Sequence, residues 1–261
     1  MKKFLNRFLF YRSQFTQIAF TLAETLIVIG ILGVVAALTL PNLNHATGDK
    51  EIVTRVKKIN SSLTEALDRA EVTYGSMDEW FRNDTTNAQR TERLAKRVVE
   101  FMKVSKDCGL AKGETCFKNT YKYLNPSKDS DYSTVGNSED IYKVLLSDGT
   151  SLGFNFIGVA TGYWCIYFYV DIDGPNKGAS TKGKDLFQFQ IMNYGAQPFI
   201  LTPLHGYFTP DGLSSFLFNQ GVDSAAWILQ FDNADYLKAS STGLCPDGKT
   251  LLDGVTNTSC H

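Results

Sequence analysis

The sequence FTLAETLIVIGILGVVAALTL, from Phe20 to Leu40, decides the fold because it predicts one long apolar helix. At ~1.5 Å per residue such a helix covers roughly 31 Å, enough for the hydrocarbon core of a bilayer. The basic residues before it, with no acidic residue among them, predict a cytoplasmic N-terminus and an extracytoplasmic head. They are Lys2, Lys3, Arg7 and Arg12. We therefore expect a single-pass membrane protein.

The one charged residue of this stretch is Glu24. A carboxylate inside a membrane helix costs a few kcal/mol unless another group pairs with it. Glu24 is therefore expected to have a function and a partner.

The motif Ala19-Phe20-Thr21-Leu22-Ala23-Glu24, with the apolar run behind it, resembles the class III signal of type IV pilins and type II secretion pseudopilins. The resemblance implies that a prepilin peptidase removes residues 1–19 by cutting between Ala19 and Phe20, and that the new amine is then methylated. It also implies assembly roles for Thr21, for Pro41, and for Glu24, which meets the amine of another subunit. The family usually has Gly before the cut, where this sequence has Ala19.

The N-terminal stretch also fits two simpler kinds of segment. An ordinary secretory signal is cleaved after an apolar region of about 7–15 residues, which is shorter than this one. A plain uncleaved anchor would leave Glu24 and the Phe-Thr-Leu start without a role.

A second apolar pattern predicts that the helix continues into the head. The apolar residues recur at steps of three and four, which is typical of an amphipathic helix packed on a sheet, with a short coiled coil as the alternative. Pro41 is expected to kink or locally break this helix and Gly75 to end it. Ser76 and Glu79 fit a capping box for a short second helix, and a third is expected over about 88–104. The apolar residues of the long helix are Ile52, Val56, Ile59, Leu63, Leu67 and Ala70.

The predicted domain organisation has three parts. Residues 1–19 form a cytoplasmic prepilin leader. Residues 20–73 form the long helix, of which 20–41 is the transmembrane part. Residues 74–261 form a globular α/β head.

Four strands are expected in the head. Alternating apolar side chains, many of them β-branched or aromatic, predict each strand, and Asp148-Gly149 between two such runs predicts a tight hairpin. The runs lie near 141–146, 152–156, 164–170 and 186–192. We therefore predict an α+β fold in which a long N-terminal helix, partly transmembrane and partly amphipathic, packs on a four-stranded antiparallel sheet. The pilin resemblance implies the same lollipop-like architecture.

The polar segment that begins at Asp171 is the candidate metal site. Oxygen-bearing side chains around a glycine resemble the start of a calcium loop, and some pseudopilins hold calcium in such a loop. The spacing departs from the EF-hand pattern, and lysines nearby supply charge that a cation site would not need. A polar turn capped by Asp and Asn side chains is the alternative. The candidate ligands are Asp171, Asp173, Asn176 and Asp185.

The five cysteines suggest an oxidising compartment. Cys108 with Cys116, and Cys245 with Cys260, are close enough in sequence to close small loops. Each bond would contribute about 3 kcal/mol in the chain-entropy model. Cys165 lies inside a predicted strand, and we expect it to be a free, buried thiol.

Composition and motifs narrow the functional classes. The chain has 26 basic and 27 acidic side chains and a net charge of −1, so no basic excess marks a nucleic-acid binder. The three histidines, His45, His205 and His261, belong to no recognisable catalytic motif. We therefore expect no enzyme activity.

These observations together predict a structural subunit of a type IV pilus or of a type II secretion pseudopilus-like filament, assembled through its N-terminal helix after leader cleavage. The pilin resemblance implies as partners the prepilin peptidase, other pilin or pseudopilin subunits, the assembly platform and the inner membrane. One alternative is a minor or initiating pilin whose head binds a ligand such as DNA or a surface. Another is a membrane-anchored binding module that does not polymerise.

Overall fold

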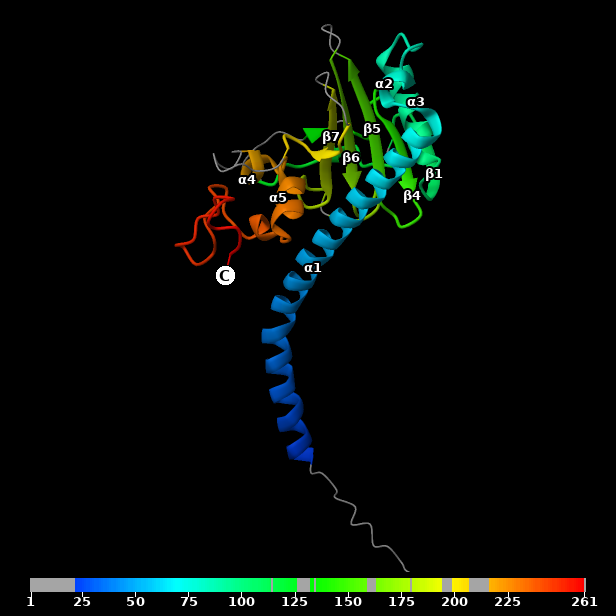
Figure 1. Cartoon of the computed structure of the whole chain (residues 1–261). Helices are drawn as coiled ribbons and strands as arrows, with labels where there is room; N and C mark the ends of the chain where they lie inside the picture. The colour runs from blue at the N-terminus through cyan, green and yellow to red at the C-terminus, as the bar shows by residue number, and fades with distance from the viewer. Residues whose placement is uncertain are drawn as a thin grey trace, which may run out of the picture. The chain divides into compact units, whose positions relative to one another are not determined.

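The computed structural model in Figure 1 describes most of the chain after residue 21. The chain divides into two compact units, Met1–Ala46 and Thr47–His261. For residues 36–47, 132–133 and 216 the structure describes the backbone alone. The described ranges are 22–113, 115–125, 132–133, 135–158, 163–178, 180–193, 199–206 and 216–260.

The first element, α1 (Leu22–Tyr74), is helical throughout. It passes through Pro41 and Gly48, so the local break expected at Pro41 is absent from the described backbone. The helix ends at Gly75, whose φ of +82° suits glycine and whose N–H donates to the carbonyl of Glu71 at 2.9 Å.

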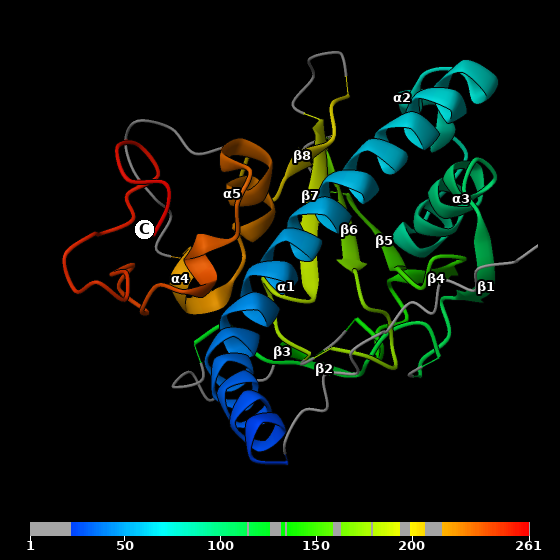
Figure 2. The same cartoon turned by 90° about the horizontal axis from the view of Figure 1, so that it is seen from below.

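Within the second unit, α1 buries one face, as its sequence pattern predicts. Val56, Leu63 and Ala70 have no exposed surface, and Ile59 and Leu67 are 5% exposed. These residues belong to the same hydrophobic core as the inner face of the sheet. Figure 2 shows this part of α1 crossing the sheet between α5 and α3.

The main sheet has six strands in the order β1-β4-β5-β6-β7-β8, and every pairing is antiparallel. Phe154, Phe168 and Phe189 stand side by side on three neighbouring strands and are fully buried in the core. A separate two-stranded sheet pairs β2 (Thr120–Tyr121) with β3 (Tyr132–Ser133). The strands of the main sheet are β1 (Val104–Gly109), β4 (Tyr142–Leu146), β5 (Ser151–Gly158), β6 (Trp164–Asp171), β7 (Leu186–Asn193) and β8 (Thr202–Pro203).

The predicted number of four strands is wrong. The four expected strands are present as β4 to β7, and Asp148-Gly149 does join β4 to β5 as a hairpin. Two of the missed strands, β2 and β3, form the separate small sheet, and the other two lie at the edges of the main sheet. β1 reads VSKDCG, has no fully buried residue and contains register shifts, and β8 has two residues, one of them proline. Neither strand has the alternation that identifies a half-buried strand, because edge strands are often short, polar or bulged.

The predicted membrane span is also wrong. Among the described residues, no helix is long and apolar enough to cross a membrane. This finding contradicts the expected transmembrane part at 20–41. It also contradicts the expected single-pass localisation, with a cytoplasmic N-terminus and an extracytoplasmic head.

Shorter helices complete the core on the α1 face. α2 (Met77–Trp80) follows the long helix, but Ser76 makes no side-chain cap hydrogen bond, so the capping box expected there is wrong. The capping box belongs instead to α3 (Asn87–Val99), where Thr86 and Gln89 exchange side-chain and backbone hydrogen bonds. The C-terminal part contains α4 (Phe216–Gln220), α5 (Ser224–Phe231) and the 3₁₀ turn η1 (Asp235–Leu237).

The opposite face of the sheet carries a second, smaller core. Phe117 and Tyr121, both fully buried, pack there with Tyr169. Gly153 makes this possible, because a Cβ atom there would lie 3.0 Å from a methyl group of Ile141 and 3.4 Å from Phe117. The segment before β4 therefore covers the face that the long helix leaves open.

Candidate functional site

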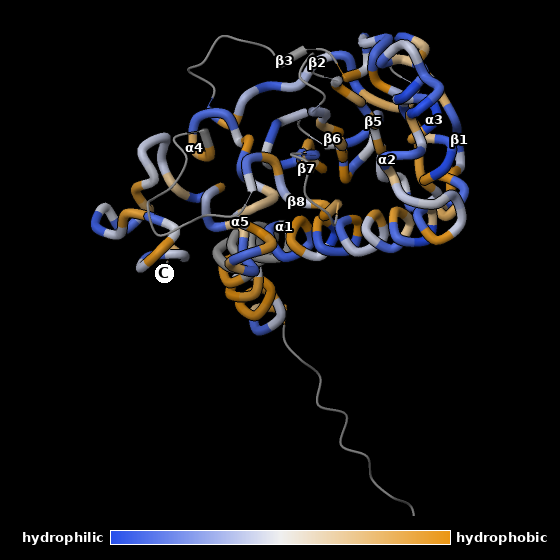
Figure 3. The backbone as a smooth tube through the Cα atoms, turned by 45° about the horizontal axis from the view of Figure 1, so that its top comes forward, coloured by the Kyte–Doolittle hydropathy of each residue, from blue (hydrophilic) through white to orange (hydrophobic). Residues whose placement is uncertain are grey.

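The apolar start of α1, from Leu22 to Val35, is the first candidate functional surface, and we call it the apolar segment. Every side chain in it is exposed, and its large apolar side chains are between 51% and 80% exposed. The start of the helix is mainly orange, the colour of hydrophobic residues, in Figure 3. A helix that is apolar on all sides is normally buried by its surroundings, and exposed apolar surface of this extent marks an interaction site.

Glu24 is the one described acidic residue of the apolar segment, and it lies in the first turn of α1. A carboxylate at the N-terminus of a helix gains roughly 0.3–1 kcal/mol from the helix dipole. The helix dipole alone therefore favours a carboxylate at the position of Glu24. Ala19, Phe20 and Thr21 lie outside the described residues, and of Pro41 the structure describes the backbone alone.

Gly30 and Gly33 give the apolar segment two positions without side chains. Among the described residues, a Cβ atom at either position would meet no heavy atom within 4 Å apart from the neighbouring backbone of the helix itself. Neither glycine is therefore required for packing among the described residues. Glycine in a helix interior costs about 1 kcal/mol relative to alanine, so these positions weaken the helix without a compensating contact from the part of the chain that the structure describes.

The candidate calcium loop is built around Asp171, which is fully buried at the end of β6. One of its carboxylate oxygens accepts the N–H groups of Asp173 at 3.0 Å and Gly174 at 2.9 Å. The other accepts the hydroxyl of Tyr121 at 2.6 Å. Burial raises the pKa of Asp171 to about 6, although the hydrogen bonds from Tyr121 and Asp173 act in the opposite direction. One oxygen of Asp171 thus accepts hydrogen bonds within the turn, and the other accepts one from the second core.

The other acidic side chains of the loop meet around Gly178. A Cβ atom there would lie 2.7 Å from a carboxylate oxygen of Asp185 and 2.9 Å from one of Asp173, so these two residues are the pair closest to sharing a cation. However, Asp185 accepts the N–H of Thr181 at 2.7 Å, and the ammonium group of Lys118 donates to the carbonyl of Gly178 at 3.3 Å. The described part of the chain contains no group of three or more His, Cys, Asp or Glu residues suited to a metal. The geometry favours a polar turn, the alternative that the sequence left open.

The two predicted disulfides are present. Cys108 and Cys116 are bonded with their Cα atoms 6.3 Å apart, and Cys245 and Cys260 with theirs 5.5 Å apart. Cys165 is free and buried, as expected. The first bond joins β1 to the segment that covers the back of the sheet.

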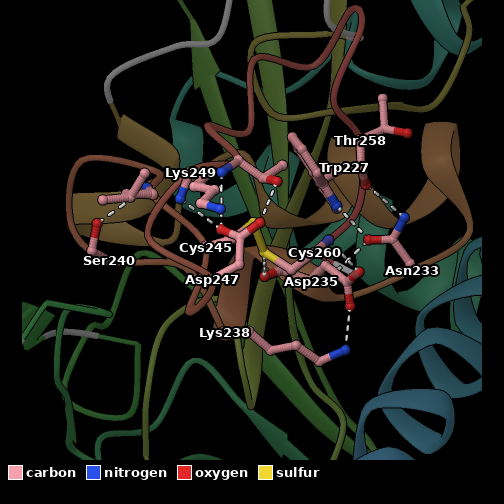
Figure 4. Close-up of a disulfide and its surroundings, with 12 residues drawn as sticks. Trp227, Asn233, Asp235, Lys238, Ser240, Cys245, Asp247, Lys249, Thr258 and Cys260 are labelled. Atoms are coloured by element: carbon pink, nitrogen blue, oxygen red, sulfur yellow. Dashed lines mark hydrogen bonds and ion pairs between the residues drawn. A yellow bond between two sulfur atoms is a disulfide. The ribbon is translucent and has the colours of Figure 1, made fainter.

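The second disulfide fixes the C-terminal tail, as Figure 4 shows. Beside it, the N–H of Cys260 donates to Asp235 at 2.8 Å. Asn233 donates to the carbonyl of Thr258 at 2.9 Å and accepts the indole N–H of Trp227 at 2.8 Å. Since Trp227 is fully buried, these bonds connect the tail directly to the core.

His205 lies in a polar pair that sequence reasoning missed. Its Nδ1 is 2.9 Å from the carboxylate of Asp223, whose side chain is 3% exposed. His205 itself has a φ of +60°, a left-handed conformation that is uncommon for a residue other than glycine. Because the two residues belong to different loops and neither lies in a recognisable motif, the sequence gives no signal for this pair.

A cavity of about 670 Å³ lies between α1 and the β4–β5 hairpin. Ile59, Phe101 and Leu146 provide apolar surface in it. The ammonium group of Lys58 lies 2.6 Å from the carboxylate of Asp148 and so joins the long helix to the hairpin turn.

These features define a disulfide-bonded α+β protein with an antiparallel sheet and an exposed apolar helical segment. The chain belongs to a family of unknown function, DUF6613, which matches residues 42–217. The matched region begins after the apolar segment and ends before the Cys245–Cys260 disulfide. No curated protein and no solved structure matches the chain.

Proposed function

We propose that this chain is a structural, non-catalytic subunit of a filament of the type IV pilus or type II secretion pseudopilus kind. The observation that carries the proposal is the exposure of every side chain from Leu22 to Val35 in a helix that is almost entirely apolar. In this proposal, prepilin peptidase removes residues 1–19, and other subunits and an assembly platform are the partners. The resemblance of the Ala19–Glu24 motif supports this part of the proposal.

The apolar segment of a second subunit is the occupant that we propose for this surface. Burying one Leu, Ile or Val side chain contributes about 1.5–3 kcal/mol. Burying several such side chains together contributes enough free energy to offset the roughly 4–15 kcal/mol that association costs in lost translational and rotational freedom. Glycines at positions 30 and 33, on which none of the described residues packs, would let a second helix approach closely.

Glu24 would set the axial position of each subunit in the filament. Its carboxylate would pair with the N-terminal amine of Phe20 in a neighbouring subunit. This contact joins two different surfaces, and a head-to-tail contact of that kind generates an open filament when its rotation does not close into a ring. A buried ion pair adds little net stability, but leaving one charge buried alone costs several kcal/mol, so the pairing specifies register.

The test is the Glu24→Gln substitution, which removes the charge and keeps the size. We expect normal leader cleavage, an unchanged free energy of unfolding for the second unit, and at least a tenfold loss of the variant from sheared filaments when it is co-expressed with the wild type. Glu65→Gln, on the same helix but in an exposed pair with Arg69, is the matched control and should be incorporated normally. Wild-type incorporation of Glu24→Gln would contradict the proposed assembly role.

A further inference from the structure

A small pocket of about 240 Å³ lies at the ends of β5 and β6, in the second unit. Four aromatic residues line it: Phe81, Phe156, Tyr163 and Trp164. Three of the rings are held firmly against one another, because the ring centroids of Phe81 and Phe156 are 4.6 Å apart and those of Phe156 and Trp164 are 5.7 Å apart. Tyr163, in contrast, is 47% exposed. The pocket thus has a rigid aromatic wall and one exposed aromatic side chain.

The wall is supported from behind, so its shape does not depend on a ligand. Phe199 packs on Trp164 with the ring centroids 5.0 Å apart, and Phe81 does so at 5.8 Å. Phe81 and Phe156 are 7% and 3% exposed, so these two rings support the half-buried ring of Trp164 and do not themselves present a face to a ligand. A preorganised aromatic surface binds a ligand without the ordering cost that a mobile one would add.

Charged groups lie around this aromatic wall. The guanidinium group of Arg90 lies over the ring of Phe156 at 5.5 Å and donates to the carbonyl of Asp84 at 2.7 Å. Arg82 also lines the pocket and has a side chain that is 73% exposed. Asp78 accepts a hydrogen bond from Asn193 at 3.0 Å. The rim therefore offers both donors and acceptors.

Gly158 keeps the pocket open. A Cβ atom at this position would lie 3.2 Å from the side-chain oxygen of Asn87 and 3.5 Å from a guanidinium nitrogen of Arg90. The N–H of Gly158 points the same way and donates to Asn87 at 3.4 Å. A side chain at position 158 would therefore take up the space between the aromatic wall and the polar rim.

The balance of charge indicates what kind of ligand fits. Two guanidinium groups and one carboxylate line the pocket, and Glu79 pairs with Arg82 at 3.2 Å beside it. A polyanion such as a nucleic acid selects a clustered basic surface, which this one is not. A ligand with an apolar face for the aromatic rings and hydroxyl groups for the rim uses both parts of the pocket.

We propose that this pocket binds one pyranose ring of a neutral saccharide. The apolar face of the sugar stacks on Trp164 and is flanked by Tyr163. Arg82 and Arg90 donate to ring or hydroxyl oxygens, and Asp78 accepts from a hydroxyl group. The proposal is independent of filament assembly, since every residue that it uses lies in the second unit.

The test is saturation-transfer NMR on the full chain with three neutral probes: cellotriose, maltotriose and chitotriose. We expect at least one of them to receive saturation from the protein, with the strongest transfer on one face of a single sugar ring. Tyr163→Ala should weaken that binding at least fivefold, and Gly158→Ala should do the same by filling the pocket. Tyr163 and Gly158 are both exposed positions, so each variant should retain the fold.

Leu251→Ala, an equally exposed position on the C-terminal tail, is the control and should bind the sugar as the wild type does. If none of the three probes binds, or if Tyr163→Ala binds as tightly as the wild type, the saccharide site is wrong. Binding of a single-stranded thymidine octamer that Tyr163→Ala abolishes, without sugar binding, would assign the pocket to nucleic acid and overturn the proposal. None of these measurements requires a filament.

Discussion

Two stretches of the same helix differ in how much of their apolar surface is buried. From Leu22 to Val35, α1 is apolar on all sides, and every side chain is exposed. From Val53 to Ala70 it is apolar on one face, and that face is buried under the sheet's core. The difference teaches that the distribution of apolar residues around a helix decides which part of it the sheet can cover. A single apolar stripe fits the one face that the chain's own sheet buries, whereas a helix that is apolar all round has no single face of this kind.

The largest expected effect comes from replacing one leucine in each stretch with alanine. Leu63 is fully buried, whereas Leu26 is 56% exposed. Leu63→Ala should lower the free energy of unfolding by about 2–5 kcal/mol, because it removes apolar contacts and leaves a cavity. Leu26→Ala should leave the same quantity within about 0.5 kcal/mol. Denaturant unfolding of the dilute full chain, followed by tryptophan fluorescence, measures both.

This pair of variants can break the comparison. A loss above about 1 kcal/mol for Leu26→Ala would mean that the apolar segment packs on residues of its own chain. Incorporation into filaments should respond differently from stability. Leu26→Ala should weaken incorporation, although it leaves the isolated subunit as stable as the wild type.

A smaller effect is expected from pH, and it belongs to the second unit alone. Burial raises the pKa of Asp171 to about 6 in the folded chain, compared with about 4 for an unfolded aspartate. Between these values the folded chain holds more protons than the unfolded one. The stabilising contribution is therefore fully present below about pH 4 and is lost as the pH rises through about 6, by roughly 3 kcal/mol.

Asp171→Asn should flatten this dependence while keeping an oxygen to accept the N–H groups of the turn. Unfolding midpoints in urea at pH 4, 5, 6 and 7 measure it for both proteins. Part of the slope should persist in the variant, because burial also raises the pKa of Asp185. Asp140→Asn, at an exposed position, is the control. An unchanged slope in Asp171→Asn would mean that Asp171 is not the group responsible.

The sequence predicted those parts of the fold whose side chains alternate or repeat. The four central strands and the buried stripe of α1 have such patterns because each has one face in the core. β1 and β8 escaped because edge strands bury little, and the capping box was placed at Ser76 because Ser-x-x-Glu also fits there by chance. The membrane span was inferred from length and hydropathy alone, neither of which specifies what covers an apolar helix.

The candidate sites were less predictable than the fold. Both disulfides followed from cysteine spacing, since short loops bring their ends together at little entropic cost. Asp173 and Asp185, two of the candidate metal ligands, do lie close together around Gly178. The sequence could not indicate that the hydroxyl of Tyr121, 50 residues earlier, donates to an oxygen of Asp171. Nor could it bring Phe81, Phe156 and Trp164 together, because their contacts depend on how α2 meets the sheet.

The smallest expected effect is also the sharpest comparison, because the same substitution is made in both regions. Gly33→Ala places a methyl group where no heavy atom lies within 4 Å, and alanine favours a helix by about 1 kcal/mol over glycine. Gly153→Ala places it 3.0 Å from Ile141, between the sheet and the second core. Gly33→Ala should therefore leave the free energy of unfolding of the second unit unchanged, while Gly153→Ala should lower it by about 1–3 kcal/mol.

Unfolding curves and the fraction recovered in sheared filaments distinguish the two roles of Gly33. If close approach of a second helix depends on the missing side chain, Gly33→Ala should fold as the wild type does and yet enter filaments less efficiently. If Gly33→Ala destabilises the second unit as Gly153→Ala does, the apolar segment is covered by its own chain, and the contrast between the two stretches of α1 is lost. Normal folding with normal incorporation would leave the contrast standing but would remove Gly33 from the contact between subunits.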